Sequence, residues 1–167
     1  MCRRGLKLEI ELVPSTSWFT NLRSLMTQNQ WDFVRQACYV AADHRCEICN
    51  GRGRKHPVEC HEVWEYDDKK RTQTLLRTIA LCPSCHQVKH IGLQMKRGME
   101  YFQRAIDHFI KVNKISEQQA EDYIMTAFAQ HNQRSKVNWA VDVSWIERRH
   151  PTYFKRKPLK IGEECNV

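Results

Sequence analysis

The chain has 167 residues, a formal net charge of +8 and 28% charged residues, which suits one compact domain that buries its own core. The basic balance favours a polyanionic partner, although it fits nucleic acid, an anionic membrane surface or mere solubility equally well. No apolar run approaches the ~20 residues of a membrane span, and no apolar stretch of the kind that a signal peptide needs follows Met1 to Gly5. We therefore expect an intracellular, cytoplasmic protein with no membrane partner and reduced thiols.

The first part of the chain predicts one strand and one helix. Apolar and charged residues alternate over 6–13, as in a half-buried strand, and Pro14 ends the pattern. From Trp31 to about Ala42, apolar residues recur at helical spacing and form a stripe. These two elements are expected to pack beside whatever core the middle of the chain forms.

The middle of the chain predicts two strands and a short helix. Residues 50–57 are a turn-rich, basic loop. Two segments with the length of a strand follow: 58–64, which begins after Pro57, and the apolar run at 75–81. A helix should begin at Pro83, because proline is favoured at the first helical position, and end near Gly92, because glycine commonly follows a helix.

Two longer helices are predicted after this, at about 97–113 and 117–131. Ser116 with Gln119 gives the second one a capping box at its start, and the apolar stripes of both predict core packing. Residues 148–160 are basic with interleaved aromatic residues. We expect one compact domain built from the following segments: an N-terminal strand and helix (1–42), a central core (43–93), a helical extension (94–147) and a basic tail (148–167).

The cysteines form two C-x-x-C hooks, Cys46 with Cys49 and Cys82 with Cys85. Two thiolates separated by two residues can reach one ion, and two such hooks complete the tetrahedral shell of a structural zinc site. A redox role is the alternative, but in a reducing compartment paired hooks favour metal. Four cysteines lie outside the hooks and are expected to be free and buried: Cys2, Cys38, Cys60 and Cys165.

Three histidines accompany these hooks. His86 and His90 are four residues apart on the short predicted helix, so their rings should share one face. His61 lies on the preceding strand. Each histidine alone could be an ordinary surface or sheet residue, but the joint arrangement of a strand histidine and two helical ones predicts a site for a divalent ion.

These motifs resemble those of the zinc-supported HNH endonucleases. The resemblance rests on the first hook, on Val-Glu-Cys-His-Glu-Val-Trp at 58–64 and on Leu-Cys-Pro-Ser-Cys-His-Gln-Val-Lys-His at 81–90, and it covers about residues 43–93. The segments 14–23 and 139–144 also look like the flanks of small HNH proteins from bacteria and phages. The resemblance implies an α+β protein of a bacterial or phage-infected host cell, with a ββα-metal HNH core, two zinc knuckles and flanking N- and C-terminal helices.

The resemblance also implies roles for the histidines. His61 would be the general base that deprotonates a water for attack on a phosphodiester, which suits a group with an ordinary pKa of ~6.5. His86 and His90 would be metal ligands. The ion, Mg²⁺ or another divalent cation, would neutralise the phosphate and stabilise the leaving oxygen. Lys89 could contact phosphate or be a solvated lysine.

The chain departs from the HNH pattern at two positions. Arg77 stands where the family has the asparagine that orients the base, and Cys60 stands where it has a metal ligand, although thiolate is a poor ligand for Mg²⁺. Two neighbouring carboxylates could substitute. Strand alternation puts Glu59 on the face of His61 and favours it as the orienting partner, whereas Glu62, a candidate for the catalytic site, would reach the metal only if the strand bends.

The expected function is therefore metal-dependent cleavage of DNA, with structural Zn²⁺ and a second divalent ion. One alternative is a non-catalytic, zinc-stabilised nucleic-acid-binding protein on a degenerate HNH scaffold, which Arg77 in place of asparagine favours. The other is cleavage of RNA, because nothing in the sequence indicates recognition of the 2′-hydroxyl. Basic residues at 52–55, 69–71 and in the tail would contact phosphates. The oligomeric state is open, although double-strand cutting by a single-site enzyme would favour a dimer.

Overall fold

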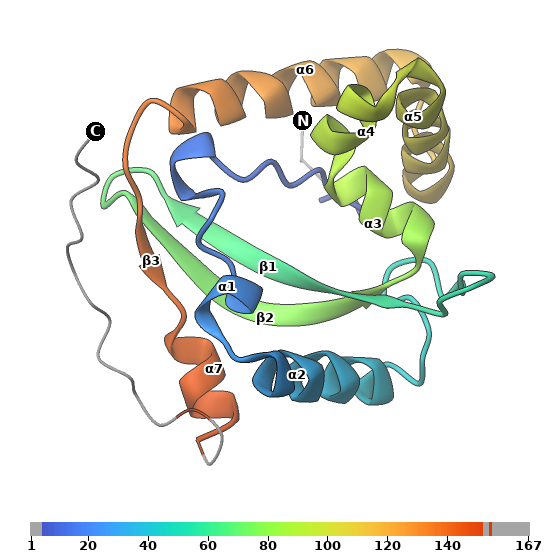
Figure 1. Ribbon diagram of the computed structural model, residues 1–167. Helices are drawn as coiled ribbons and strands as arrows, with labels where there is room; N and C mark the ends of the chain where they lie inside the picture. Colours follow the sequence, from blue (N-terminus) through green and yellow to red (C-terminus); the bar gives the residue numbers. More distant parts are fainter. Residues whose placement is uncertain (1–4, 152–153, 155–167) are drawn as a thin grey trace.

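A long antiparallel hairpin forms the centre of the fold (Figure 1). The computed structural model describes residues 5–151 and residue 154. Strands β1 (Glu59–Asp67) and β2 (Thr72–Leu81) pair in antiparallel fashion, and the short β3 (Ala140–Asp142) adds to β2 in parallel, in the order β1-β2-β3. Both strands of the hairpin were predicted, but each is longer than the segment predicted for it, 58–64 or 75–81.

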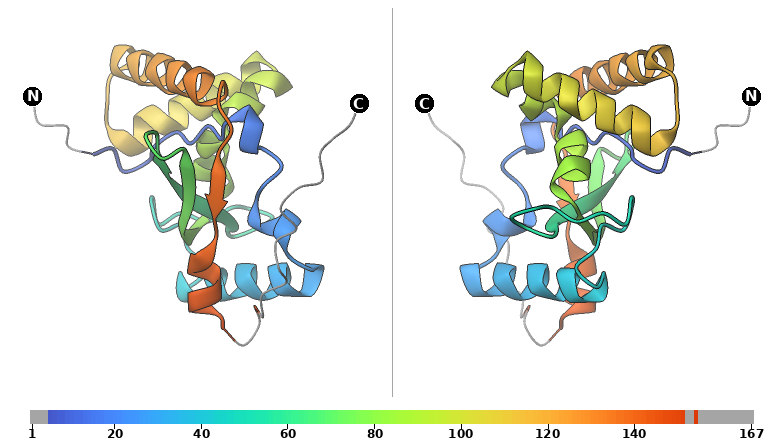
Figure 2. Two further views of the ribbon diagram at one scale, coloured as in Figure 1. Left: turned by 90° about the vertical axis from the view of Figure 1, so that its left-hand side faces the viewer. Right: turned by 90° about the vertical axis from the view of Figure 1, so that its right-hand side faces the viewer.

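Helices cover both faces of this sheet (Figures 1 and 2). On one side lie α3 (Pro83–Lys89), α4 (Ile91–Arg97), α5 (Met99–Asn113) and α6 (Glu117–Arg134); on the other lie α1 (Leu22–Leu25), α2 (Gln28–Ala41) and α7 (Ser144–Arg149), and a 3₁₀ turn spans Ser15–Ser17. The described part of the chain is thus a mixed α+β structure, as expected. None of its helices is long and apolar enough to span a bilayer.

The two faces of the hairpin pack against different cores. Ile79 and Leu81 of β2 join the buried cluster that includes Val88 of α3 and Phe109 of α5. On the opposite face, Leu75 packs with residues of α1, α2 and α7. A register shift between Val63 and Trp64 of β1 interrupts the ladder, and an irregularity of this kind re-aims side chains along a strand.

The helix boundaries follow the end signals with one exception. Pro83 begins α3 and the capping box of Ser116 begins α6, both as predicted. The predicted end near Gly92 is wrong, because α3 stops at His90 (φ −102°, ψ 40°) and α4 then continues to Gly98. Gly98 has a φ of 133°, a conformation that glycine adopts far more readily than other residues.

The strand predicted at 6–13 is absent from the described structure. The alternation correctly marks Leu8 and Ile10 as buried, yet the backbone of this segment pairs with no strand. Instead, Leu8 exchanges two hydrogen bonds with the Asn113 side chain, and the Glu11 N–H donates to the carbonyl of Lys89. Side-chain burial therefore alternates without a sheet partner, since helices occupy this side of the hairpin.

The end of the chain contains two elements that the sequence did not predict, β3 and α7. The parallel pairing of β3 with Thr72–Thr74 brings the C-terminal part of the chain beside the hairpin. Of the basic tail, only residues 148–151 and Phe154 lie within the described residues. The other residues of the tail, whose basic side chains were predicted to contact phosphates, lie outside them, as do Cys2 and Cys165.

Candidate metal centres

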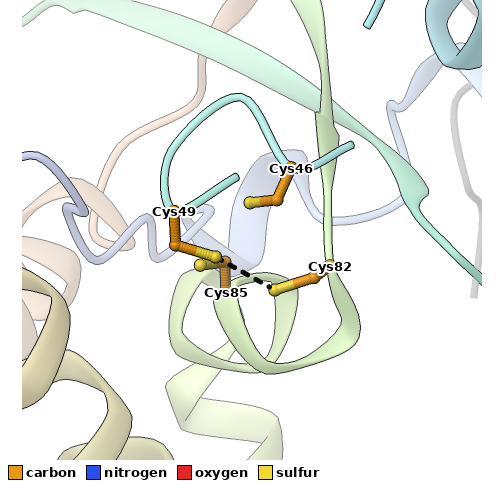
Figure 3. A group of neighbouring side chains, drawn as sticks. All are labelled: Cys46, Cys49, Cys82 and Cys85. Carbon is orange, nitrogen blue, oxygen red and sulfur yellow. Dashed lines mark hydrogen bonds between the residues drawn. The ribbon is translucent and has the colours of Figure 1, made fainter. Parts of the chain in front are cut away.

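The four hook cysteines come together at one end of the hairpin (Figure 3). Cys46 and Cys49 belong to the loop before β1, Cys82 follows β2, and Cys85 lies in the first turn of α3. Their four sulfur atoms lie within 4.8 Å of one another, and those of Cys49 and Cys82 are 3.6 Å apart. Tetrahedral zinc with bonds of ~2.3 Å requires a sulfur separation of about 3.8 Å. The group therefore fits a metal ion such as zinc.

Neighbouring groups donate to these sulfurs and fix the hooks. The Gly51 N–H donates to Sγ of Cys49 at 3.4 Å, and Nε2 of His108 on α5 lies 3.2 Å from Sγ of Cys85. Such donors orient metal ligands. Glu47, inside the first hook, accepts from Arg77 and from the backbone N–H of Ala80, both at 2.8 Å, which ties the hook to β2.

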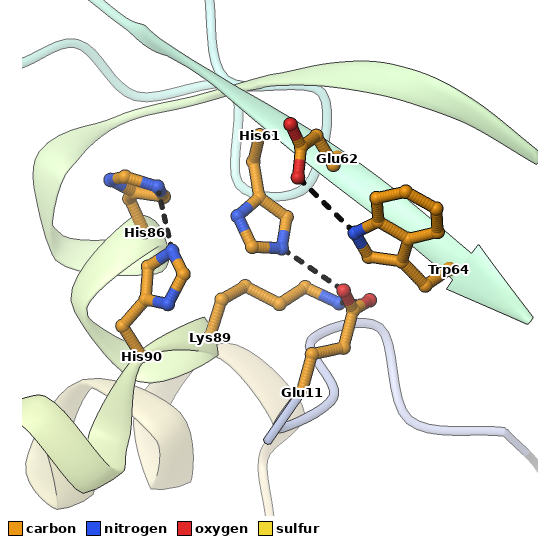
Figure 4. A network of polar contacts seen from close by, with 7 residues as sticks. All are labelled: Glu11, His61, Glu62, Trp64, His86, Lys89 and His90. Atoms are coloured by element: carbon orange, nitrogen blue, oxygen red, sulfur yellow. Dashed lines mark hydrogen bonds and ion pairs between the residues drawn. The ribbon is translucent and has the colours of Figure 1, made fainter. Parts of the chain in front are cut away.

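A second group brings together the three predicted histidines, His61 of β1, His86 of α3 and His90 at its end (Figure 4). One ring nitrogen from each lies within 4.8 Å of the others. The Nε2 atoms of His86 and His90 are 3.1 Å apart, which is close to the separation of about 3.0–3.5 Å expected for two imidazoles on one ion at bonds of ~2.1 Å. These rings therefore suit one divalent transition-metal ion.

Two of the histidines each form a hydrogen bond with a carboxylate. Oε2 of Glu11 lies 3.0 Å from Nε2 of His61, and Oε2 of Glu59 bonds to Nδ1 of His86. Each carboxylate can hold one ring nitrogen in its protonated form, so that the other nitrogen presents a lone pair to the site. For His61 that second nitrogen, Nδ1, lies on the side of His86 and His90 (Figure 4).

The prediction that Glu59 orients His61 is wrong, because that partner is Glu11. Glu59 shares the strand face of His61 as expected, but its carboxylate reaches across to α3 and bonds His86. The sequence missed Glu11 because the alternation over 6–13 places it among residues expected to face solvent. Nothing local to Glu11 marks it as a partner of a residue 50 positions away.

Burial sets the charge states of the group. Burial lowers the pKa of His61, although the bond to Glu11 opposes this, and burial lowers the pKa of His90 to about 3, helped by the neighbouring His61 and His86. For Glu11, burial raises the pKa, but the bonds and charges of His61 and Lys89 outweigh it and the net shift is downward. The lowered pKa values favour neutral imidazoles at His61 and His90 at neutral pH, the form that both a base and a metal ligand need.

Lys89 is neither a solvated lysine nor free to contact phosphate. Its side chain is 7% exposed, and Nζ donates to Oε1 of Glu11 at 2.6 Å. A buried ammonium needs such a partner, so Lys89 and His61 hold the two oxygens of one carboxylate.

Glu62, Cys60 and Arg77 lie apart from the histidine nitrogens. The carboxylate of Glu62 accepts from the backbone N–H of Leu22 at 2.7 Å and from the indole of Trp64 at 3.2 Å, and burial raises its pKa. Cys60 packs near buried Cys38 beneath α2. Arg77 is engaged by Glu47. Glu62 and Arg77 therefore make contacts that stabilise the fold, and neither side chain belongs to the histidine group.

Comparisons with protein-family models, with curated proteins and with solved structures find no match to this chain. The interpretation of the two centres therefore depends on their geometry and chemistry.

Proposed function

We propose that this protein is a metal-dependent endonuclease of the HNH type that hydrolyses phosphodiester bonds in DNA. The observation that carries the proposal is the convergence of His61, His86 and His90. His61 lies on β1, and the other two lie on α3 and at its end. β1, β2 and α3 follow one another in the chain as strand, strand and helix. The four cysteines would hold structural zinc, which fixes α3 against the end of β2. The histidine group would hold a second ion at His86 and His90.

The chain's own groups have separate tasks in this proposal. The bound ion would neutralise the phosphate and stabilise the leaving oxygen. His61 takes the proton of the attacking water at Nδ1, because Nε2 is engaged by Glu11. Glu11 does the work that the HNH pattern gives to asparagine, and Glu59 keeps the Nε2 lone pair of His86 directed into the site.

The donor set favours a particular class of ion. Imidazole nitrogens suit Zn²⁺, Ni²⁺ and other first-row transition metals, whereas Mg²⁺ prefers hard oxygen ligands. No carboxylate belongs to the histidine group among the described residues. We therefore expect Ni²⁺ or Zn²⁺ to support cleavage better than Mg²⁺.

The test is cleavage of plasmid DNA by wild type and by His61→Ala, with the metal content of each protein measured in parallel. A general base contributes typically 10²–10⁴-fold, so His61→Ala should lose about that much rate and keep its metal. His44→Asn is the control, since His44 is exposed with a φ of 52°, which asparagine tolerates. It should cut like wild type.

Three other results would each point elsewhere. Loss of the second ion along with activity in His61→Ala would make His61 a ligand and remove its role as base. Binding of DNA with no cleavage in any metal would favour the non-catalytic binding module. Cleavage of RNA in preference to DNA would change the substrate class.

A further inference from the structure

A cavity of about 280 Å³ opens beside the histidine group. It lies against the rings of His61, His86 and His90, and its wall continues away from them toward α1 and α2. Its remaining walls include three indole side chains and one buried amide: Trp18, Trp31, Trp64 and Gln73. Ligand pockets are typically ~300–1,000 Å³ for drug-sized molecules, so this one suits a smaller, flat group.

Gln73 is the least expected member of this wall. It is 0% exposed, and neither the oxygen nor the nitrogen of its amide has a hydrogen-bond partner among the described residues. A buried polar group without partners is rare in native proteins and calls for a physical reason. A ligand that presents one donor and one acceptor side by side would supply both missing bonds, because the amide offers the complementary pair.

The indoles differ in how far they are buried, because Trp31 and Trp64 also pack against the buried cluster around Leu75. Trp18 is 51% exposed at this cavity. Trp64 is held in place by the bond from its Nε1 to Glu62, whose carboxylate is in turn anchored by Leu22. Figure 4 shows Trp64 and Glu62 on the far side of His61 from His86. Glu62 therefore positions a wall of the cavity.

We propose that this cavity binds one unstacked nucleobase of the nucleic-acid substrate, whose edge is read by the Gln73 amide. Every nucleobase carries an edge with adjacent donor and acceptor groups, and indole faces stack on any base. The adjoining histidines place the backbone of that nucleotide at the cleavage site. This inference rests on the proposed nuclease function, which it deepens by naming what the substrate must present.

The proposal has a direct consequence for the form of the substrate. A base inside a duplex cannot enter a pocket unless it is extruded, at a cost of a few kcal/mol. The protein should therefore prefer single strands, or duplexes with an unpaired or mismatched base, to perfectly paired DNA.

The test measures binding without added divalent ion, so that its readout does not need cleavage. A short fully abasic strand is compared with the same strand carrying a single nucleobase at its centre. Stacking alone contributes roughly 5- to 150-fold to the affinity for the second strand over the first, and the bonds of the Gln73 amide add about 2- to 10-fold to it. Gln73→Leu should therefore lower the wild-type preference about 2- to 10-fold and keep the contribution of stacking. It should not lower the melting temperature, since leucine fills the space and removes an unpartnered amide.

Gln36→Leu is the matched control, because Gln36 lies on α2 with its side chain exposed, and this variant should keep the full preference. Equal binding of the two strands by wild type would overturn the pocket, whether or not the protein cuts DNA. An unchanged preference in Gln73→Leu would overturn the role of that amide. Preference for the base with no cleavage under any metal would leave the pocket standing and refute the nuclease function.

Discussion

Glu11 offers the sharpest test of how the histidine site is built, because one carboxylate serves two buried partners. Its oxygens lie 3.0 Å from Nε2 of His61 and 2.6 Å from Nζ of Lys89, and the side chains of Glu11 and Lys89 are only 18% and 7% exposed. In Glu11→Leu the ammonium of Lys89 stays buried without a counter-charge. Removal of one member of such a pair costs about 3–5 kcal/mol, which corresponds to a fall in melting temperature of roughly 6–20 °C at ~2–4 °C per kcal/mol.

The double variant Glu11→Leu with Lys89→Met separates stability from activity. Replacing both charges with apolar groups of similar volume should restore most of the lost stability, to within ~1–2 kcal/mol of wild type. Cleavage should stay low, because Nε2 of His61 still lacks its partner. The free energy of unfolding is measured in urea with both metals loaded. A loss below ~1 kcal/mol in Glu11→Leu, or a double variant with wild-type cleavage, would refute this account of the carboxylate.

Three further substitutions test the two centres and the packing of the loop before β1 against Pro83. Cys46→Ser should leave the cysteine group unable to retain its ion, so that one metal fewer per chain is measured and the melting temperature falls. His90→Gln should weaken binding of the second ion in a metal titration by more than the ~10- to 100-fold that loss of a group supporting a ligand costs, and it should leave the cysteine-bound ion in place. Gly53→Ala should destabilise the chain by about 1–3 kcal/mol in urea unfolding, because a Cβ there would meet the His56 carbonyl oxygen at 2.1 Å and Cδ of Pro83 at 2.6 Å. Gly5→Ala, where nothing lies within 4 Å, should not change stability.

The parts of the fold that follow from local signals were predictable. The hairpin strands, α2, α5 and α6 each carry their own residue pattern. Capping boxes begin α2 and α6, and Pro83 begins α3. The two candidate centres were predictable for a related reason. Ligands three or four positions apart meet through local geometry, so each hook and the pair His86 and His90 can be predicted with little knowledge of the rest of the fold.

The supporting groups were not predictable, because they come from distant segments. Glu11 reaches His61 only after the N-terminal segment has packed against α3 and α5, and its alternating pattern indicates a strand that has no partner. Gln73 lies in β2 with 0% exposure, although a glutamine within a polar stretch indicates an exposed strand end. In both cases the residue type gives no signal, since only the tertiary contacts decide which polar side chains become buried.

The two centres are coupled through α3, and the size of this coupling can be measured. Cys85 and His86 are consecutive residues of α3, and Cys82 joins that helix to the end of β2. An ion bound by the cysteines therefore sets the distance between α3 and β1, which is the distance that brings His86 and His90 to His61. The converse must hold as well, because a coupling free energy between two binding sites is reciprocal. We therefore expect Cys46→Ser to weaken ion binding at the histidines, and an ion at the histidines to raise the affinity of the cysteine group by the same factor. Metal titration of Cys46→Ser measures the first effect, and titration of the cysteine group in wild type and in His90→Gln measures the second. Unchanged affinities in both titrations would refute the coupling through α3.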